Sequence, residues 1–160
     1  MKFEEFLSFR KLLASTLLFL LAGSSAPILP SATPQSNSQD ILSKTKSMAE
    51  TQHEIVMLLL KKKDYEKART EANKIFDMPW PENQEPLLLK ELRILTDQFV
   101  RQGQPLLGLQ ISERNFRYFK ETSSQAEILK DQGYIYKSLN QNDLALKCFQ
   151  KAQELEQKRR

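Results

Sequence analysis

Residues 126–157 read AEILKDQGYIYKSLNQNDLALKCFQKAQELEQ, and this stretch decides the fold. Helix-forming segments lie on both sides of the polar run Asn140, Gln141 and Asn142, so the pattern predicts two helices joined by a tight turn. Gly133 and Ala145 are small residues inside these two helices. They predict that the helices cross closely at these positions, because a larger side chain would hold the two backbones apart.

The same stretch has the spacing of a repeat. A 34-residue frame from Ala126 places its small, aromatic and apolar residues at Leu129, Gly133, Tyr136, Ala145, Phe149 and Ala152. These types and spacings resemble the tetratricopeptide repeat, a helical hairpin that binds other proteins and carries no chemistry of its own. The resemblance implies that Gly133 and Ala145 lie at the helix crossing, and that Tyr136, Phe149 and Ala152 fill the hairpin and its contact with a neighbour. Gln132 and Gln157 depart from the family pattern, which has an apolar residue and a proline there.

Two weaker copies of the frame lie upstream, beginning at Ala49 and Leu89. They place Ala68 and Gly108 at the close-crossing position that Ala145 holds in the third copy. The three copies cover residues 49–82, 89–122 and 126–159. The sequence therefore predicts an all-α fold, a right-handed solenoid of three helical hairpins. An unrelated bundle of helical hairpins is the alternative.

Local signals set the expected helix ends. Gly103 predicts a helix stop, Pro105 fits a first helical turn, and Asp143 is an expected N-cap. Thr122, Ser123 and Ser124 offer a second N-cap. The six expected helices cover about residues 40–62, 65–78, 85–102, 105–120, 124–139 and 143–158.

The amino terminus has the pattern of an export signal. Arg10 and Lys11 precede the uncharged apolar run LLASTLLFLLAG at residues 12–23, and small residues follow it. A positive start, an apolar run of this length and small residues predict a secretory signal peptide over residues 1–26. Because no residue from Leu12 to Gln39 is charged, an uncleaved membrane anchor is the alternative, and a buried helix is a third interpretation. The Ser-, Pro- and Gln-rich residues 27–39 predict a linker to a helical domain at residues 40–160.

The sequence offers no constellation for catalysis. His53 is the one histidine among 160 residues, without a nucleophile or ligand partner at a suitable spacing, and the one cysteine, Cys148, excludes an intramolecular disulfide. The net charge of +4 is spread among interleaved acidic and basic residues, which is typical of a solvated surface. We therefore expect no enzyme activity, no cofactor, no metal and no nucleic-acid partner.

The family resemblance also implies a binding surface. In the family the first helix of each hairpin lines a concave face, chiefly at frame positions 2, 5, 9, 12 and 13. Carried over to this chain, the groove would include His53, Met57, Lys90, Arg93, Asp97, Arg101, Lys130, Tyr134 and Lys137, with Leu60 at a further position. Basic residues predominate in the second and third repeats. The hypothesis is a groove for an acidic or carboxylate-ended extended segment, and the alternative is a solvated helix face.

Together these features predict an exported or membrane-tethered adaptor or assembly factor in a bacterial-type cell-envelope complex, facing the periplasm or the outside. The alternative is a chaperone for secreted client proteins on the cytosolic side, and an enzyme is a third. Leu144, Leu146 and Leu155 in the last repeat lack an expected capping helix, which predicts a homo-oligomer or a larger complex through this repeat.

Overall fold

The computed structural model describes residues 34–81 and 83–158, and side chains from residue 38 onward. The predicted signal or anchor segment, residues 1–26, and residues 27–33 of the predicted linker lie outside the described residues. The described residues form six α-helices and one short 3-10 helix, and they contain no strand. The predicted all-α fold is confirmed.

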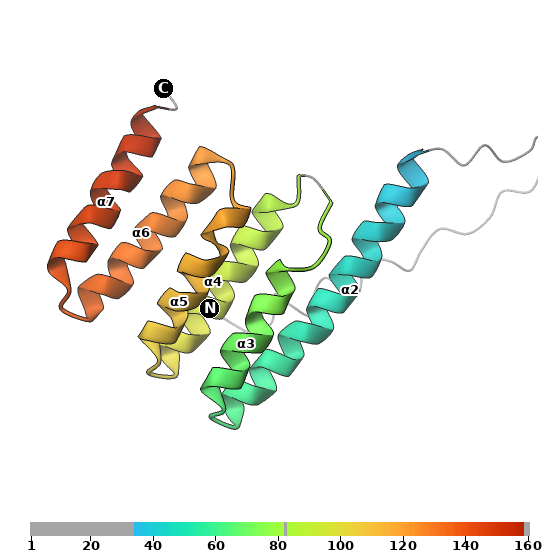
Figure 1. Cartoon of the computed structure of the whole chain (residues 1–160), viewed down its shortest axis with the longest axis horizontal. Helices are drawn as coiled ribbons and strands as arrows, with labels where there is room; N and C mark the ends of the chain where they lie inside the picture. The colour runs from blue at the N-terminus through green and yellow to red at the C-terminus, as the bar shows by residue number, and fades with distance from the viewer. Residues whose placement is uncertain (1–33, 82, 159–160) are drawn as a thin grey trace, which may run out of the picture. The chain divides into compact units, whose positions relative to one another are not determined.

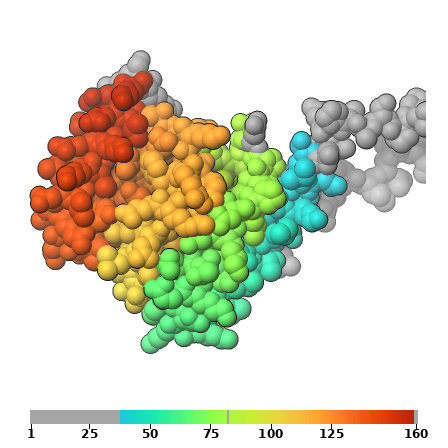
Figure 2. Space-filling model, in the orientation of Figure 1, coloured from blue at the N-terminus to red at the C-terminus, as the bar shows by residue number. Residues whose placement is uncertain are grey.

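The helices form three successive hairpins (Figure 1). Their bounds are α2 Pro34–Lys61 with α3 Tyr65–Phe76, α4 Glu85–Arg101 with α5 Pro105–Asn115, and α6 Thr122–Ser138 with α7 Asn142–Gln157, and the 3-10 helix η2 spans Phe116–Tyr118. The two helices of each hairpin pack together. Across hairpins, α3 contacts α5, α4 contacts α6 and α5 contacts α6. Figure 2 shows the hairpins following one another in chain order across the visible face.

Two helix ends differ from the sequence prediction by more than two residues. The first helix begins at Pro34 rather than Asp40, so residues 34–39, assigned to the linker by composition, are helical. Pro34 fits a first helical turn, and no further proline occurs before Pro79 to interrupt the helix. The fourth helix ends at Asn115 rather than near Lys120, because the chain turns through η2 and becomes extended at Phe119. This turn buries the Phe119 side chain in the core.

The predicted N-caps also differ. Gln141, and not Asp143, is the N-cap of α7, and Asp143 lies in its first turn, where a carboxylate still interacts favourably with the helix dipole. Helix α6 begins at Thr122 after the N-cap Glu121, which makes no side-chain capping bond. Instead, the Glu85 carboxylate of α4 accepts the backbone N–H groups of Lys120 at 3.0 Å and Glu121 at 2.9 Å.

The turn inside each hairpin repeats the same backbone geometry. Lys63, Gly103 and Asn140 adopt positive φ values of 61°, 73° and 60°. Each occupies position 15 of its frame when the frames begin at Ala49, Leu89 and Ala126. The residue after each turn donates its N–H to the carbonyl five residues earlier: Asp64 to Leu59, Gln104 to Phe99 and Gln141 to Tyr136. This is the hydrogen-bond pattern of a Schellman C-cap, so the three hairpins share one turn at one frame position.

The helices of the third hairpin lie close together at Gly133. A Cβ atom added there would lie 2.7 Å from Cε1 of Phe149, which leaves no room for a side chain. In the second hairpin, a Cβ added at Gly108 would lie 3.2 Å from the carbonyl oxygen of Thr96. Ala68 and Ala145 hold the position equivalent to Gly108 and are buried, as is Ala152, whereas Tyr136 and Phe149 are partly exposed.

The core runs through all three hairpins. Its main cluster joins residues of α2 to α6, and a second cluster consists of Ala126, Leu129 and Ala152 in the third hairpin. The Phe116 ring packs against both clusters. The hairpins are therefore parts of one continuous apolar core.

The shared turn makes a stability prediction. Replacing Gly103 with alanine should lower the free energy of unfolding by about 1 kcal/mol, because an L-residue with positive φ is strained. No atom lies within 4 Å of the added Cβ, so the effect is one of backbone conformation alone. The measurement is urea unfolding followed by circular dichroism.

The matched control is Lys63→Gly at the same frame position of the first hairpin. Glycine relieves the strain there, so this variant should be as stable as the parent or more stable. A Gly103→Ala variant with unchanged stability would contradict the left-handed turn.

Candidate partner-binding surface

The residues predicted to line the groove lie on α2, α4 and α6, the first helices of the three hairpins. Tyr134 is 63% exposed, and Lys90, Arg93, Asp97, Arg101 and Lys137 are also exposed. His53, Met57 and Lys130 are partly buried. Leu60 is buried in the core and is therefore not available to a partner, because its helix packs this side against α3 and the following repeat.

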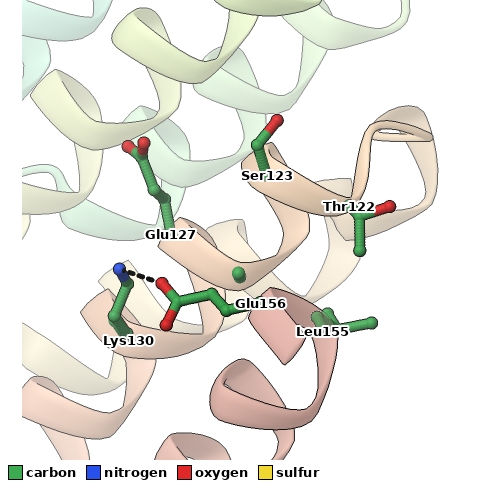
Figure 3. Close-up of a pocket in the computed structure, with 7 residues that line it drawn as sticks. Thr122, Ser123, Glu127, Lys130, Leu155 and Glu156 are labelled. Atoms are coloured by element: carbon green, nitrogen blue, oxygen red, sulfur yellow. Dashed lines mark hydrogen bonds and ion pairs between the residues drawn. The ribbon is translucent and has the colours of Figure 1, made fainter. Parts of the chain in front are cut away.

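Frame position 5 carries a basic side chain in every repeat, and each one contacts carboxylates. His53 Nδ1 lies 2.6 Å from Glu91 of α4. Arg93 forms ion pairs with Glu127 at 3.1 Å and Asp131 at 2.8 Å, both on α6. Lys130 donates to Glu156 of α7 at 2.8 Å (Figure 3). Part of the positive charge expected in the groove is therefore compensated within the chain.

These contacts change the protonation equilibria. The hydrogen bond to Glu91 raises the pKa of His53 above its ordinary value, against the effect of partial burial, and the charges of Glu91 and Glu54 add to the rise. The pKa of Asp131 is also raised, because burial outweighs the opposing charge of Arg93. The hydrogen bond to Glu156 raises the pKa of Lys130. His53 is the group among these whose charge changes near neutral pH.

Three predicted groove residues keep their polar groups available. Lys90 and Lys137 are exposed and form no ion pair with any other residue that the structure describes. Tyr134 rests edge-on against Phe149, with ring centroids 5.1 Å apart at an angle of 69°. Asp97 and Arg101 pair with each other on the surface of α4 at 2.6 Å. An exposed aromatic ring and two available ammonium groups are thus the clearest recognition features of this face.

A small pocket lies between α6 and α7 (Figure 3). It is lined by Thr122, Ser123, Ala126, Glu127, Lys130, Leu155 and Glu156 and holds about 70 Å³. That volume admits a few water molecules and is far below that of a typical small-molecule site. Among residues 34–81 and 83–158, no group of three His, Cys, Asp or Glu side chains could hold a metal ion.

The partners of the basic residues were not found by sequence reasoning. Glu91, Asp131 and Glu156 have no unusual local pattern, and only a comparison of charges between successive frames would have identified them. Gln132 was noted as a departure from the family pattern, and its reason is now clear. Its amide donates to Ser112 Oγ of α5 at 2.9 Å, so two buried polar side chains satisfy each other between hairpins.

The comparisons with known proteins concern the third hairpin. Residues 126–159 match the family model of the tetratricopeptide repeat. This hairpin is a tetratricopeptide repeat. No curated protein and no solved structure matches the chain. The two upstream hairpins share with this third hairpin a left-handed turn residue at position 15 and a basic residue at position 5. No helix within the described residues is long and apolar enough to span a membrane.

The His53–Glu91 contact predicts a pH dependence. A raised pKa in the folded state means that the contact stabilises the protein fully below the ordinary pKa and is lost as the pH rises through the folded-state pKa. The free energy of unfolding should therefore fall by up to about 1 kcal/mol between about pH 6 and pH 8. Urea unfolding at a series of pH values measures it.

A His53→Gln variant is the control, because it can still donate to Glu91 but does not titrate. Its stability should be flat over this range. Parallel pH profiles for the parent and the variant would show that His53 does not carry the effect.

Proposed function

We propose that the protein is a non-catalytic adaptor or assembly factor that binds an extended segment of another protein along α2, α4 and α6. The observation that carries this proposal is the tetratricopeptide repeat at residues 126–159, a unit that usually serves in protein binding. It is joined to two further hairpins with the same turn geometry, which lengthens the available surface.

The partner segment proposed is acidic or ends in a carboxylate. Lys90 and Lys137 supply ammonium donors without a competing ion pair among the described residues, and Tyr134 supplies an exposed aromatic surface. Charge-assisted hydrogen bonds to carboxylates are stronger than neutral ones. Arg93, Arg101 and Lys130 add donors by exchanging their present partners, and exposed ion pairs of this kind contribute only about 0–1 kcal/mol each.

The proposed location is outside the cytoplasmic membrane, in a bacterial-type cell-envelope complex. The support is the amino-terminal sequence, in which Arg10 and Lys11 precede the apolar run at residues 12–23. Retention of this segment would tether the helical domain to the membrane, and cleavage would release it. A cytosolic chaperone for secreted proteins is the alternative function, and it would have no need of this apolar run.

Self-association is a further part of the proposal. Leu144 and Leu146 of α7 are exposed in the described structure, and Leu155 is partly buried. An apolar outer face on a repeat is a site where another chain can pack.

The groove predicts a charge-dependent affinity. Lys90→Glu combined with Lys137→Glu should weaken binding of acidic ten-residue peptides with a free carboxyl terminus by about tenfold or more, because attraction becomes repulsion. Tyr134→Ala should weaken the same peptides by removing the aromatic surface. Fluorescence anisotropy with labelled peptides measures both, and amidated, uncharged peptides are the comparison.

The matched control is Lys67→Glu with Lys147→Glu, which makes the same change of charge on α3 and α7. Both lysines are exposed and lie outside the proposed groove. Equal losses in the two double variants would indicate a general charge effect and no groove.

The proposed location has its own test. Fractionation of the native cell, with amino-terminal sequencing of the product, should find the protein in the periplasmic or membrane fraction. A start near residue 27 indicates cleavage, and a start at Met1 in the membrane fraction indicates an anchor. A soluble cytosolic product that begins at Met1 would contradict export and favour the chaperone alternative.

A further inference from the structure

The first and third hairpins leave complementary faces uncovered. Inside the solenoid, Leu95 at frame position 7 of α4 and Ile135 at position 10 of α6 are 0% and 8% exposed. Their equivalents on α2, Ile55 and Leu58, are 39% and 58% exposed. The described structure thus has no preceding hairpin over this face of α2.

The opposite face of the solenoid shows the same difference. Leu109 at frame position 21 of α5 is 3% exposed, and α6 packs against this helix. Its equivalent on α7 is Leu146, which is 56% exposed. Each uncovered face therefore has apolar residues at positions that a neighbouring hairpin covers inside the chain.

We infer that a second copy of this chain packs α6 and α7 onto α2 and α3 of the first, head to tail, with the geometry of the junctions between its own hairpins. The test of this inference is whether the internal junction contacts have counterparts between copies. They do, in three places.

The first counterpart is ionic and lies on the first helices. Arg93 at position 5 of the second repeat contacts Glu127 and Asp131, at positions 2 and 6 of the third. Position 5 of the third repeat is Lys130, and positions 2 and 6 of the first repeat are Glu50 and Glu54, both exposed. Stacking of copies therefore places a lysine against two glutamates. Lys130 would exchange Glu156 for them, at small cost because the existing pair is exposed.

The second counterpart is ionic and lies on the second helices. Asp77 at position 29 of the first repeat contacts Arg114, at position 26 of the second, at 2.8 Å. Position 29 of the third repeat is Glu154 and position 26 of the first is Lys74, both exposed. The contact between copies therefore has the same sign of charge at positions 29 and 26 as the junction between the first and second hairpins.

The third counterpart is apolar. Gln132 at position 7 of the third repeat donates to Ser112 at position 24 of the second. Between copies these two positions are Ile55 and Phe149, an apolar side chain facing an aromatic one. A polar pair inside the chain is thus replaced by an apolar pair between chains, with no unmatched polar group.

This contact rests on the self-association proposed above. It specifies the surface of the second copy that the last repeat meets, which is formed by α2 and α3. It is independent of the peptide groove, because it needs no other protein. A head-to-tail contact of this kind is heterologous, so it forms chains of copies unless the rotation closes a ring.

Charge exchange between two variants tests the contact in the full-length chain in mild detergent. Sedimentation velocity should show concentration-dependent association of the parent. Lys130→Glu alone, and Glu50→Lys with Glu54→Lys alone, should each associate about tenfold or more weakly. In an equimolar mixture, contacts between the two different variants should recover the parent affinity, because each such contact again joins opposite charges, whereas contacts between identical variants stay weak.

Three results would overturn the inference. These are a parent chain that does not associate, variants that associate as strongly as the parent, and a mixture that does not recover. Association through residues 12–23 would leave the variants associating as strongly as the parent. Coverage of α2 by the chain's own amino-terminal residues would leave the parent unassociated. Circular dichroism checks that both variants remain helical.

Cross-linking tests the direction of the contact. In a Cys148→Ser background, differently tagged Glu50→Cys and Lys130→Cys chains should join through a short bismaleimide only when mixed. Cross-linking of either chain with itself would indicate a symmetric contact and would overturn the head-to-tail arrangement. Neither experiment contains a peptide ligand, so failure here leaves the groove proposal untouched.

Discussion

The structure depends on how closely the two helices of each hairpin can approach. Frame positions 8, 20 and 24 are occupied by Val56, Ala68 and Ala72, by Thr96, Gly108 and Ser112, and by Gly133, Ala145 and Phe149. A Cβ added at Gly108 would contact Thr96, and one added at Gly133 would contact Phe149. Each set combines one larger side chain with two small ones. Position 8 therefore fills the space between the two helices in the first two hairpins and position 24 fills it in the third, and the helices stay close together. The second set has a cost, because Thr96 Oγ1 is buried without a hydrogen-bond partner among the described residues.

Packing between hairpins uses polar contacts at equivalent positions. The basic residue at position 5 contacts a carboxylate of the next repeat in the first two repeats, and a carboxylate of α7 in the third. Buried polar pairs also link neighbouring hairpins, since Asn115 donates to Asn73 and Gln132 donates to Ser112. Polar pairs of this kind favour one relative position of the hairpins over others, because a shift would leave buried donors unpaired. The same contacts limit the positive charge that the proposed groove can offer.

How much of the fold could be predicted from the sequence depends on whether a feature is local or is set by contacts between distant residues. Helix existence and the turns at Lys63, Gly103 and Asn140 could be predicted, because they depend on local composition and on the frame. Helix ends were less predictable where distant groups compete. Glu85 supplies the acceptors before α6, and burial of Phe119 ends the preceding helix early. In the candidate site, the frame gave the exposed positions Tyr134, Lys90 and Lys137, and only the contacts between helices showed which other cations have partners.

By itself, the sequence determined the all-α class and the tetratricopeptide repeat at residues 126–159, since periodicity and small residues at the crossing are local properties. It also contains the apolar run on which the proposed location rests. The tertiary structure decided which side chains remain available, because burial and ion pairing depend on the neighbouring hairpin. Leu60 is lost to the core, Arg93 is engaged by Glu127 and Asp131, and Ile55 and Leu146 are left exposed where no described hairpin lies next to them.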